Sequence, residues 1–276
     1  MKKTRLFALL GILILAVSVF VVAKPDFVST ENPAGKEVSI PENAVKISEG
    51  VYSLGTAKDV NGKLVQGFMI IHDKKENAKQ PGGSGGGGSG GGSTCYAFLA
   101  DGAKWKTLEP WVVNTANTEG LTQDFVYNNL VADIQKWESS ASYNILGDGS
   151  ITSDFLVADT SSPDGKNEVY FADVKSSGAI AITIVWGIFG GPVDQRVLVE
   201  WDQVYDDADF DWSSTGEVGK MDFENIATHE LGHSAGLKDL YTSKCSAQTM
   251  YGYANYGETN KRTLEAGDKA GIAKLY

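Results

Sequence analysis

The sequence predicts an α+β fold built on a mixed, twisted sheet. Three β-rich runs lie close together between residues 168 and 205, a helical apolar repeat precedes them, and two more helical segments follow. Strands in one block with long helices before and after them favour this class over a regular alternation of strand and helix. The chain has 276 residues, of which 42% are hydrophobic and 21% are charged. It is therefore long enough to bury a core, and its composition excludes a disordered or fibrous protein.

The first two elements follow from local patterns. Residues 104–114 alternate well enough for a first strand. Thr122 is a suitable N-cap for a helix over 123–139. The apolar positions of this helix repeat at helical spacing. They are Val126, Leu130, Ile134 and Trp137.

Three shorter β runs and two helices complete the predicted order. The β runs cover residues 168–174, 179–189 and 196–205. The second helix begins after Asp222 as its N-cap and continues to about Ala235. The third helix is expected over residues 263–275.

The N-terminus is predicted to direct the chain out of the cytoplasm. Residues 1–23 combine a basic start with an apolar run over 6–23, which is typical of a secretory signal peptide. An uncleaved signal-anchor is the alternative, because the apolar run is just long enough to span a bilayer. Both interpretations place the rest of the chain in a compartment that permits disulfides.

A glycine-rich tract divides the remaining chain. Residues 24–80 contain an extended leader and a small β unit in which Asn61-Gly62 signals a hairpin turn. Residues 81–94 are predicted to form a flexible linker, and engineered linkers share this composition. Residues 95–276 have the length of one normal domain.

The charge distribution restricts the partners. The chain carries 24 Lys and Arg against 35 Asp and Glu, a net charge of −11. This acidic balance argues against a nucleic-acid partner, because phosphate binding needs clustered basic residues. Residues 1–94 carry +3 and residues 95–276 carry −14, so the two parts would attract each other, subject to screening by salt.

Residues 229–239 combine the ligand types and the spacing of a metal site. They read His229-Glu230-Leu-Gly-His233-Ser-Ala-Gly236-Leu-Lys-Asp239. Histidines four residues apart share one face of a helix, so both can bind one ion, and Glu230 lies where it reaches a water on that ion. Gly236 lets the chain leave the helix, so that Asp239 returns as an oxygen ligand. This spacing arises by chance on the order of once in 10^5, which disfavours an amphipathic surface helix that merely carries two histidines.

The pattern HExxHxxGxxD resembles the metzincin signature of zinc-dependent peptidases, and the matrixin-like members in particular. Thr249-Met250-Tyr251 resembles the Met-turn of that group. Residues 262–276 are similar to the C-terminal helix that closes matrixin catalytic domains. The resemblance covers residues 95–276 and implies a zincin-like catalytic domain with an active-site helix, a C-terminal helix and one catalytic Zn²⁺.

The resemblance also implies the roles of individual residues. His229, His233 and Asp239 would hold the zinc ion. Glu230 would act as general base, and Met250 would support the site from below.

The chain departs from the family pattern in three respects. Asp239 stands where a third histidine is usual. The chain has only three histidines, so we expect no structural zinc. Residues 24–94 do not resemble the usual matrixin prodomain.

Substrate-binding residues are expected on both sides of the metal site. The resemblance makes strand 179–186 the sheet edge, where Ala181 and Thr183 would pair with an extended peptide. A buried core strand is the alternative. Tyr251 and Tyr253 are expected to line a substrate pocket or to pack, and the alternative is that one of them steadies the oxyanion or binds zinc.

One acidic loop is a candidate for Ca²⁺, which takes several oxygen ligands. A solvated acidic loop is the favoured interpretation, because the glycine and glutamate of an EF-hand are not at the required positions. The acidic residues of this loop are Asp206, Asp207, Asp209 and Asp211.

Cys95 and Cys245 are expected to form a disulfide, because two thiols in one extracytoplasmic domain most often pair. The alternative is that Cys95 binds the catalytic zinc and keeps the enzyme latent, as a prodomain cysteine does in many matrixins. The surrounding residues STCYAF do not match the switch motif of that family.

The sequence therefore predicts a secreted or membrane-tethered zinc endopeptidase that is a monomer and acts on peptides or proteins. Membrane contact would occur only through residues 6–23, if these are uncleaved. Residues 24–80 are interpreted as a propeptide or an accessory β module. The alternatives are a binding or adhesion module with a structural zinc, a peptide-binding pseudoenzyme or inhibitor, and a hydrolase of a non-peptide amide. Glu230 favours the peptidase over the first two, because neither needs a carboxylate at that position.

Overall fold

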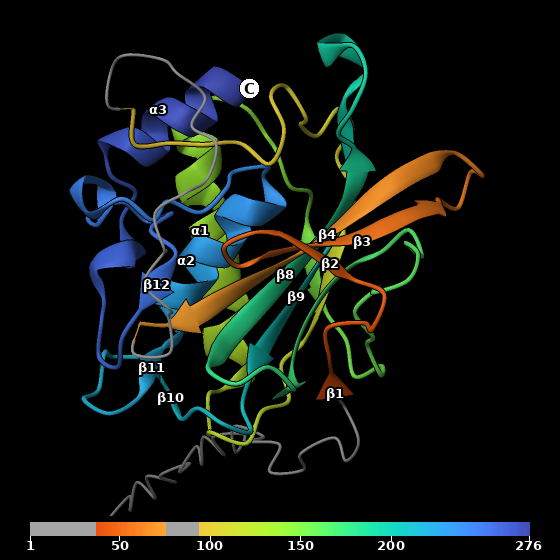
Figure 1. Cartoon of the computed structure of the whole chain (residues 1–276). Helices are drawn as coiled ribbons and strands as arrows, with labels where there is room; N and C mark the ends of the chain where they lie inside the picture. The colour runs from red at the N-terminus through yellow and green to blue at the C-terminus, as the bar shows by residue number, and fades with distance from the viewer. Residues whose placement is uncertain (1–36, 76–93) are drawn as a thin grey trace, which may run out of the picture.

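The computed structural model describes residues 37–75 and 94–276, and within them it confirms the α+β class. Ten strands form one mixed sheet, and three α-helices lie together on one side of it (Figure 1). The strands of this sheet are β1 (Glu37–Val38), β2 (Val45–Ser48), β3 (Val51–Lys58), β4 (Leu64–Lys74), β5 (Trp111–Asn114), β6 (Gly149–Ile151), β7 (Asn167–Val174), β8 (Ala179–Ile188), β9 (Val197–Asp206) and β12 (Tyr253–Ala254).

The helices and one small sheet complete the inventory of the described residues. The α-helices are α1 (Gln123–Ala141), α2 (Phe223–Ser234) and α3 (Ala266–Leu275). The two-stranded sheet consists of β10 (Trp212–Ser213) and β11 (Met221–Asp222). The short 3₁₀ helices are η1 (Val193–Gln195), η2 (Ser243–Cys245) and η3 (Asn260–Arg262).

The main sheet has the spatial order β2-β3-β4-β8-β9-β7-β5-β6, with β1 beside β7 and β12 beside β4. Strands β6, β5, β7 and β9 are mutually parallel, whereas β8 runs antiparallel to β9 and β4 runs antiparallel to β8. The sheet is therefore mixed, and its antiparallel half contains β2, β3 and β4, whereas β1 pairs parallel with β7.

Both faces of the sheet are buried, and alternation along β8 shows how the side chains are divided. Ala181 and Val185 belong to the core between the sheet and the helices. Ile182 and Trp186 belong to a second core on the opposite face, which Leu156 helps to close. Side chains at every second position of a strand point to the same face, so β8 is buried on both sides and reads as a continuous apolar run.

The helix boundaries follow the predicted caps. Helix α1 begins after Thr122, whose hydroxyl accepts a hydrogen bond from the Phe125 amide at 3.2 Å. Helix α2 begins after Asp222, as predicted. Helix α3 begins at Ala266, later than expected, because Glu265 forms a capping box with the residue at the third helical position and fixes the helix start there.

The first strand is shorter than predicted. We expected it over 104–114, but β5 covers only Trp111–Asn114. Pro110, directly before it, has no N–H to donate to a neighbouring strand. Trp105 lies outside the sheet. Its Nε1 donates a hydrogen bond to the Ser234 carbonyl oxygen, at the end of α2, over 2.7 Å.

The predicted hairpin lies between β3 and β4. Asn61-Gly62 is part of the loop formed by residues 59–63, where Gly62 has a φ of +79°. The Asp59 carboxylate accepts hydrogen bonds from the amides of Asn61 and Lys63 at 2.9 and 2.8 Å. The turn type is therefore set by aspartate and glycine together.

The N-terminal strands extend the main sheet. β4 pairs antiparallel with β8 from Gln66 opposite Gly187 to Asp73 opposite Ala179. The expectation that strand 179–186 forms the sheet edge is therefore wrong, because β8 lies between β4 and β9. The physical reason is that β4 satisfies the backbone groups that an edge strand would leave unpaired.

Several predicted segments lie outside the described residues. They are the signal segment 1–23, the leader up to residue 36 and the linker up to residue 93. Within residues 37–75 and 94–276, no helix is both long and apolar enough to cross a membrane.

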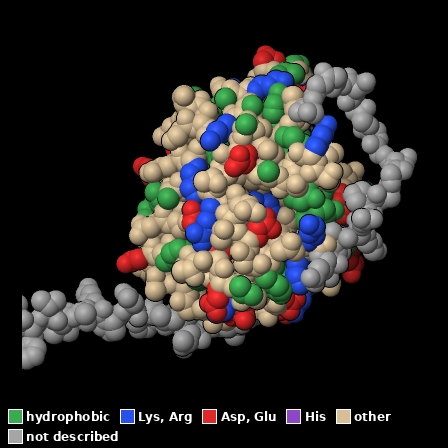
Figure 2. All heavy atoms as spheres, turned by 90° about the vertical axis from the view of Figure 1, so that its left-hand side faces the viewer, with side chains coloured by type: hydrophobic (Ala, Val, Ile, Leu, Met, Phe, Trp, Pro, Cys, Tyr) green, Lys and Arg blue, Asp and Glu red, His purple; other side chains and the backbone are tan. Residues whose placement is uncertain are grey.

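All three histidines of the chain are fully buried. Figure 2 views the molecule from the side on which the helices lie in Figure 1, and no histidine side chain is visible on that face. Basic and acidic side chains are interspersed there (Figure 2). The chemistry predicted at residues 229–239 is therefore enclosed by the fold.

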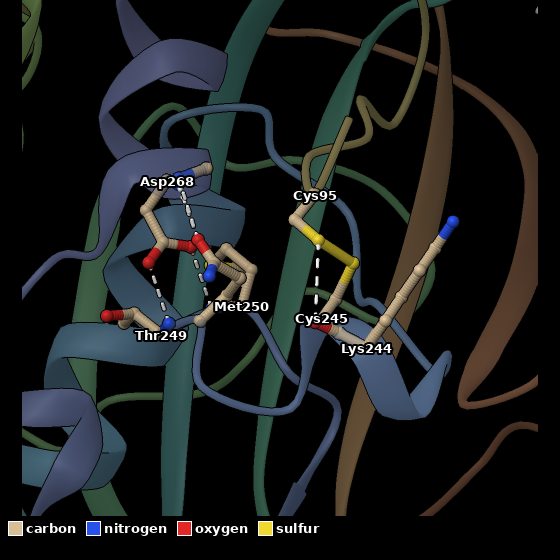
Figure 3. Close-up of a disulfide and its surroundings, with 8 residues drawn as sticks. Cys95, Lys244, Cys245, Thr249, Met250 and Asp268 are labelled. Atoms are coloured by element: carbon tan, nitrogen blue, oxygen red, sulfur yellow. Dashed lines mark hydrogen bonds between the residues drawn. A yellow bond between two sulfur atoms is a disulfide. The ribbon is translucent and has the colours of Figure 1, made fainter. Parts of the chain in front are cut away.

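Cys95 and Cys245 form a disulfide with an S–S distance of 2.04 Å (Figure 3), as the sequence predicts. The bridge joins residues 150 positions apart. It ties the start of the main domain to η2, just before the loop that contains Met250. A sulfur held in this bridge is not free to bind a metal, which excludes Cys95 as the latent ligand.

Replacing both cysteines, Cys95→Ser with Cys245→Ser, is expected to lower the free energy of unfolding by up to about 5 kcal/mol, because the unfolded chain loses a long covalent loop. Urea unfolding of the oxidised protein and the variant measures the difference. The reduced wild-type chain is the matched control and should unfold like the variant. Equal stability of all three forms would contradict this prediction.

Candidate metal centre

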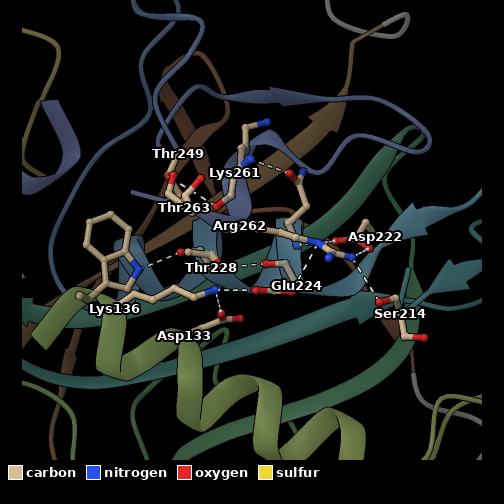
Figure 4. A network of polar contacts seen from close by, with 12 residues as sticks. Asp133, Lys136, Ser214, Asp222, Glu224, Thr228, Thr249, Lys261, Arg262 and Thr263 are labelled. Carbon is tan, nitrogen blue, oxygen red and sulfur yellow. Dashed lines mark hydrogen bonds and ion pairs between the residues drawn. The ribbon is translucent and has the colours of Figure 1, made fainter. Parts of the chain in front are cut away.

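Helix α2 carries the candidate ligands, and a network of charged residues fixes its first turn (Figure 4). Every residue of Phe223–Ser234 except Glu224 is buried. The N-cap residue Asp222 accepts from Arg262 Nε at 2.8 Å, and Arg262 Nε also lies 3.4 Å from Glu224. A carboxylate at a helix N-terminus interacts favourably with the helix dipole.

Helix α1 holds α2 through a second set of contacts (Figure 4). Lys136 Nζ lies 2.6 Å from Asp133 and 2.7 Å from Glu224. Trp137 donates from Nε1 to the Thr228 carbonyl oxygen at 2.9 Å. Burial raises the pKa of Asp133 to about 7, although Lys136 is adjacent. The two helices are therefore joined at Glu224 and Thr228, before the first predicted ligand, His229.

Three predicted ligands converge at the end of α2. His229 Nε2 and His233 Nε2 lie 3.1 Å apart, and Asp239 Oδ1 lies 3.1 and 3.4 Å from these two atoms, respectively. Ligand atoms about 2.0–2.2 Å from a tetrahedral zinc ion lie roughly 3.3–3.5 Å from one another. Asp239 Oδ1 is also buried without a hydrogen-bond partner. The donor set therefore fits one divalent ion such as zinc.

The opposite nitrogen of each imidazole is fixed by the backbone. His229 Nδ1 lies 2.7 Å from the Thr249 carbonyl oxygen, and His233 Nδ1 lies 3.0 Å from the Leu237 carbonyl oxygen. A carbonyl oxygen only accepts, so each Nδ1 carries the proton and donates it. The lone pair of each Nε2 then faces the other ligands, which is the arrangement of metal-binding histidines.

The three side chains also interact electrostatically. Burial alone would lower the pKa of His233, but the Asp239 carboxylate raises it to about 9. Burial would raise the pKa of Asp239, but the two imidazoles hold it well below its usual value. Burial lowers the pKa of His229 to about 4. The Asp239 carboxylate therefore favours one positive charge among these three side chains, on His233.

Gly236 and Tyr241 place the aspartate. Gly236 has a φ of +102°, so the chain leaves α2 in a conformation that favours glycine. Asp239 then returns beneath the two imidazoles, as predicted from the sequence. The Tyr241 hydroxyl lies 3.1 Å from Asp239 Oδ2 and 3.3 Å from the Glu49 carbonyl oxygen. Tyr241 thereby holds the oxygen that does not face the imidazoles.

Met250 lies beneath the helix and is anchored through its backbone (Figure 3). A β-carbon on Gly232 would come within 2.2 Å of Met250 Sδ, so the methionine requires glycine at that position of α2. Asp268 Oδ2 accepts from the Thr249 amide at 2.7 Å, and Asp268 Oδ1 accepts from the Met250 amide at 3.1 Å. Thr249 is also the residue whose carbonyl orients His229. Asp268 of α3 therefore supports the candidate site from outside it.

A comparison with known protein families supports this interpretation. The sequence model of the Matrixin family matches residues 198–276, which extend from β9 to α3 and include α2, Asp239 and Met250. This part of the chain is matrixin-like. The match supports a function of the zinc metalloprotease kind, and zinc is the metal that the family implies. No curated protein matches the chain.

Glu230 lies beside the three candidate ligands but faces another group of residues. Glu230 Oε2 accepts a hydrogen bond from the Thr183 hydroxyl of β8 at 2.6 Å. Glu230 Oε1 lies 3.0 Å from His72 Nδ1 of β4. Burial raises the pKa of Glu230 to about 7, so the site does not favour a permanent charge there. This carboxyl group can therefore take up and release a proton near neutral pH.

The tyrosines after the matrixin-like Met-turn border a cavity of about 430 Å³. Tyr251 and Tyr253 both line it, together with Tyr256 and Lys75. Tyr253 also belongs to β12, which pairs with the end of β4. The structure thus places both predicted tyrosines at a pocket wall.

Calcium binding by the acidic loop, the less favoured of the two interpretations, is not supported. Asp206 Oδ1 accepts from the amides of Ala208 and Asp209 at 2.9 and 3.0 Å, and Asp207 Oδ2 accepts from the Thr118 amide at 2.9 Å. These carboxylates therefore cap turns. Among the described residues, the side chains close enough to share a metal ion do not include Asp206, Asp207, Asp209 or Asp211.

Sequence reasoning missed three residues at or around the matrixin-like centre. His72 was the only histidine left unassigned, and it lies in an apolar β run, which was a usable signal. Tyr241 follows Asp239 by two positions, but only the fold shows that its hydroxyl reaches the carboxylate. Asp268 is recognisable from sequence as part of a helix start, but its contacts with the Met-turn depend on the packing of α3.

The variant Asp268→Ala is expected to lower the free energy of unfolding by roughly 2–4 kcal/mol, because it leaves the Thr249 and Met250 amides buried without an acceptor. Metal affinity should fall with it, since the Thr249 carbonyl orients His229. Chemical unfolding and a zinc titration measure the two effects. The exposed neighbour Lys269→Ala is the control and should change stability by less than about 0.5 kcal/mol.

The variant Asp133→Asn tests the buried carboxyl group between α1 and α2. The pKa of Asp133 is raised from 3.8 to about 7 in the folded protein, so the folded state binds a proton that the unfolded state releases. The protonated Asp133 carboxyl group should therefore stabilise the wild type at low pH. This contribution to the free energy of unfolding should be lost as the pH rises from about 4 to 7. Relative to the wild type, the variant should become more stable across this range, by at most about 4 kcal/mol. Unfolding curves at several pH values measure this, and a constant difference would contradict it.

Proposed function

We propose that the chain is a zinc-dependent endopeptidase that hydrolyses peptide bonds with a metal-activated water. The observation that carries this proposal is the arrangement at the end of α2. His229, His233 and Asp239 present three mutually close donor atoms, while Glu230 lies on the neighbouring side of the helix. A structural zinc site is normally closed by four protein ligands, whereas this group has three donor residues and a buried carboxyl group beside them.

The chain's own residues divide the work between binding and proton transfer. A bound zinc ion would lower the pKa of a water and polarise a carbonyl group. Glu230 takes the proton of the attacking water on a carboxylate oxygen and later gives it to the departing amine. The Thr183 hydroxyl, hydrogen-bonded to Oε2, leaves Oε1 as the oxygen that exchanges the proton. Met250 and Asp268 keep the base of the site rigid.

The proposed substrate is an extended segment of a peptide or protein. Backbone pairing of a peptide with β8 at Ala181 and Thr183 would align it with Glu230, and it requires β4 to give up its own pairing with these residues. The cavity beside Tyr251 and Tyr253 would accept a substrate side chain. Because backbone groups are common to all peptides, this arrangement selects extended conformation more than side-chain identity.

The proposed location is outside the cytoplasm. The disulfide between Cys95 and Cys245 supports an oxidising compartment, and the signal-like residues 1–23 fit secretion or tethering to the outer face of a membrane. We propose action as a monomer.

The variants Glu230→Gln and His233→Ala separate hydrolysis from metal binding. Glu230→Gln should keep about one zinc ion per chain and reduce hydrolysis of denatured casein by at least 10²-fold, because the amide cannot accept the proton. His233→Ala should lose the metal itself. Metal analysis and mass spectrometry of the fragments measure these outcomes. Unchanged cleavage by Glu230→Gln would overturn the proposed mechanism.

A further inference from the structure

We propose that Asp159, Asp164 and Glu200 form a second cation site, which takes a divalent ion of the size of Ca²⁺ and fastens the loop over residues 152–166 to β9. The site is separate from the candidate metal centre on α2, and it shares no residue with the acidic loop at 206–211. It does not depend on the proposed function. The proposal rests on three converging carboxyl groups, on two buried oxygen atoms without partners and on an adjoining cavity.

The site lies on the face of the sheet that points away from α2. Trp201 of β9 belongs to the core between the sheet and the helices. Side chains at alternate positions of a strand point to opposite faces, so Glu200 and Asp202 point to the face of the second core. The loop over residues 152–166, between β6 and β7, covers this face, because Leu156 is part of the second core. Glu200 therefore comes from the sheet, and the loop brings the other two carboxyl groups to it.

The three carboxyl groups are close enough to share one ion. One oxygen atom from each of Asp159, Asp164 and Glu200 lies within 4.8 Å of the other two. Two oxygen atoms bound to one Ca²⁺ ion at about 2.3–2.6 Å can be up to about 5 Å apart, whereas two bound to Mg²⁺ at about 2.0–2.1 Å can be only about 4 Å apart. The group therefore fits a calcium-sized ion, and donors that are all oxygen atoms favour such an ion over zinc.

Two oxygen atoms of this group are buried without a partner. Glu200 has only 1% of its surface exposed. Its Oε2 atom accepts a hydrogen bond from the Gly165 amide. Its Oε1 atom and Asp159 Oδ2 are buried and have no hydrogen-bond partner in the described part of the chain. Burying such atoms without a partner is costly, and a cation bound to both oxygen atoms offsets this cost.

The backbone of Asp159 is fixed so that its side chain faces Glu200. Asp202 Oδ2 accepts a hydrogen bond from the Asp159 amide at 2.8 Å, and Asp202 Oδ1 accepts from the Glu168 amide at 3.2 Å. Trp186 of β8 donates from Nε1 to the Asp159 carbonyl oxygen at 2.8 Å. The amide and the carbonyl of Asp159 are therefore both held by the sheet, and its carboxyl group is placed before a cation binds.

Negative charge accumulates at this point. Burial, together with the Asp202 carboxyl group, raises the pKa of Glu200 to about 10, and burial raises the pKa of Asp202 well above its usual value. Lys166 Nζ lies 2.8 Å from Asp164 Oδ2, but the Lys166 side chain is largely exposed. A carboxyl group in this position loses its buried charge by keeping a proton or by binding a cation. One shared proton joins only two oxygen atoms, whereas three carboxyl groups converge here, so the geometry favours the cation.

A cavity of about 220 Å³ adjoins Glu200. Asp59, Glu109 and Gly165 also line it. Acidic residues around a cavity create a negative potential that attracts cations. Ca²⁺ takes about six to eight oxygen ligands, some of them waters. The cavity gives such waters a place beside the three carboxyl groups.

Titration of the metal-stripped full chain with Ca²⁺, followed by isothermal calorimetry, tests the proposal. We expect about one Ca²⁺ per chain with a Kd of about 1 mM or lower, the range of extracellular calcium modules. Saturating zinc should leave this Kd unchanged, because zinc binds at α2. Mg²⁺ should bind at least about tenfold more weakly.

Three results of this titration would overturn the proposal. Competition between zinc and Ca²⁺ would place the calcium ion at α2. Equal affinity for Mg²⁺ would reject the assignment by ion size. No binding at about 10 mM Ca²⁺, well above the range of extracellular modules, would show that protons alone neutralise the carboxyl groups.

Two variants locate the ion. Asp164→Asn removes an exposed carboxylate, and Glu200→Gln removes a buried one with little change in shape. Each should raise the Kd for Ca²⁺ at least about tenfold, since affinity depends on the number of charged ligands. The control Asp154→Asn changes an exposed carboxylate of the same loop outside the group and should leave the Kd unaltered. Asp164 lies at the surface, so its variant requires no repacking of the core, and an unchanged Kd in Asp164→Asn would contradict the proposal.

Terbium luminescence and thermal unfolding give independent readouts. Tb³⁺ replaces Ca²⁺ at oxygen sites and emits light when a neighbouring tryptophan transfers energy to it, and Trp186 is hydrogen-bonded to Asp159. We expect emission that excess Ca²⁺ removes and that Asp164→Asn lowers at least about tenfold. Ca²⁺ should also raise the Tm of the wild type and of Asp154→Asn but not of Asp164→Asn, because the ion binds the folded state. Emission and Tm that do not distinguish Asp164→Asn from Asp154→Asn would reject the site.

Discussion

The enclosure of α2 between the sheet and α1 is the constraint on which the rest of the structure depends. Three ionisable residues of this helix, His229, Glu230 and His233, have no exposed surface, and burying such groups is costly unless each has a partner. The surrounding loops supply those partners. Carbonyl oxygens fix the two imidazoles, and Thr183 of β8 fixes the glutamate. The turn at Gly236, the loop that contains Met250 and strand β8 therefore all supply hydrogen-bond partners to the buried side chains of this one helix.

The contacts that fix α2 form successive layers around the candidate ligands. The Met-turn orients His229, α3 holds the Met-turn through Asp268, and the disulfide fixes the loop that precedes it. Ion pairs among Lys136, Glu224 and Arg262 join the first turn of α2 to its neighbours. Rigid supports of this kind keep ligand atoms close together before a metal is bound, so less order has to be gained on binding.

Strand β4 determines whether β8 lies at the edge of the sheet or inside it. Without β4, β8 would be an edge strand with unpaired backbone groups in front of Glu230. With β4 in place, the same backbone groups belong to the interior of a ten-stranded sheet. One strand thereby decides whether the backbone groups of β8 are paired on both sides or on one side only.

The sequence by itself determined the elements whose causes are local. Thr122 and Asp222 predicted the starts of two helices, and the spacing of His229, Glu230, His233 and Asp239 predicted that four polar side chains would meet, because helical periodicity and a glycine exit act over a few residues. Only the tertiary structure decided that His72 lies against Glu230 and that Ala181 and Thr183 are covered. Those contacts join residues about 110–160 positions apart. Strand pairing over such separations depends on the packing of the whole sheet, and no local sequence pattern specifies it.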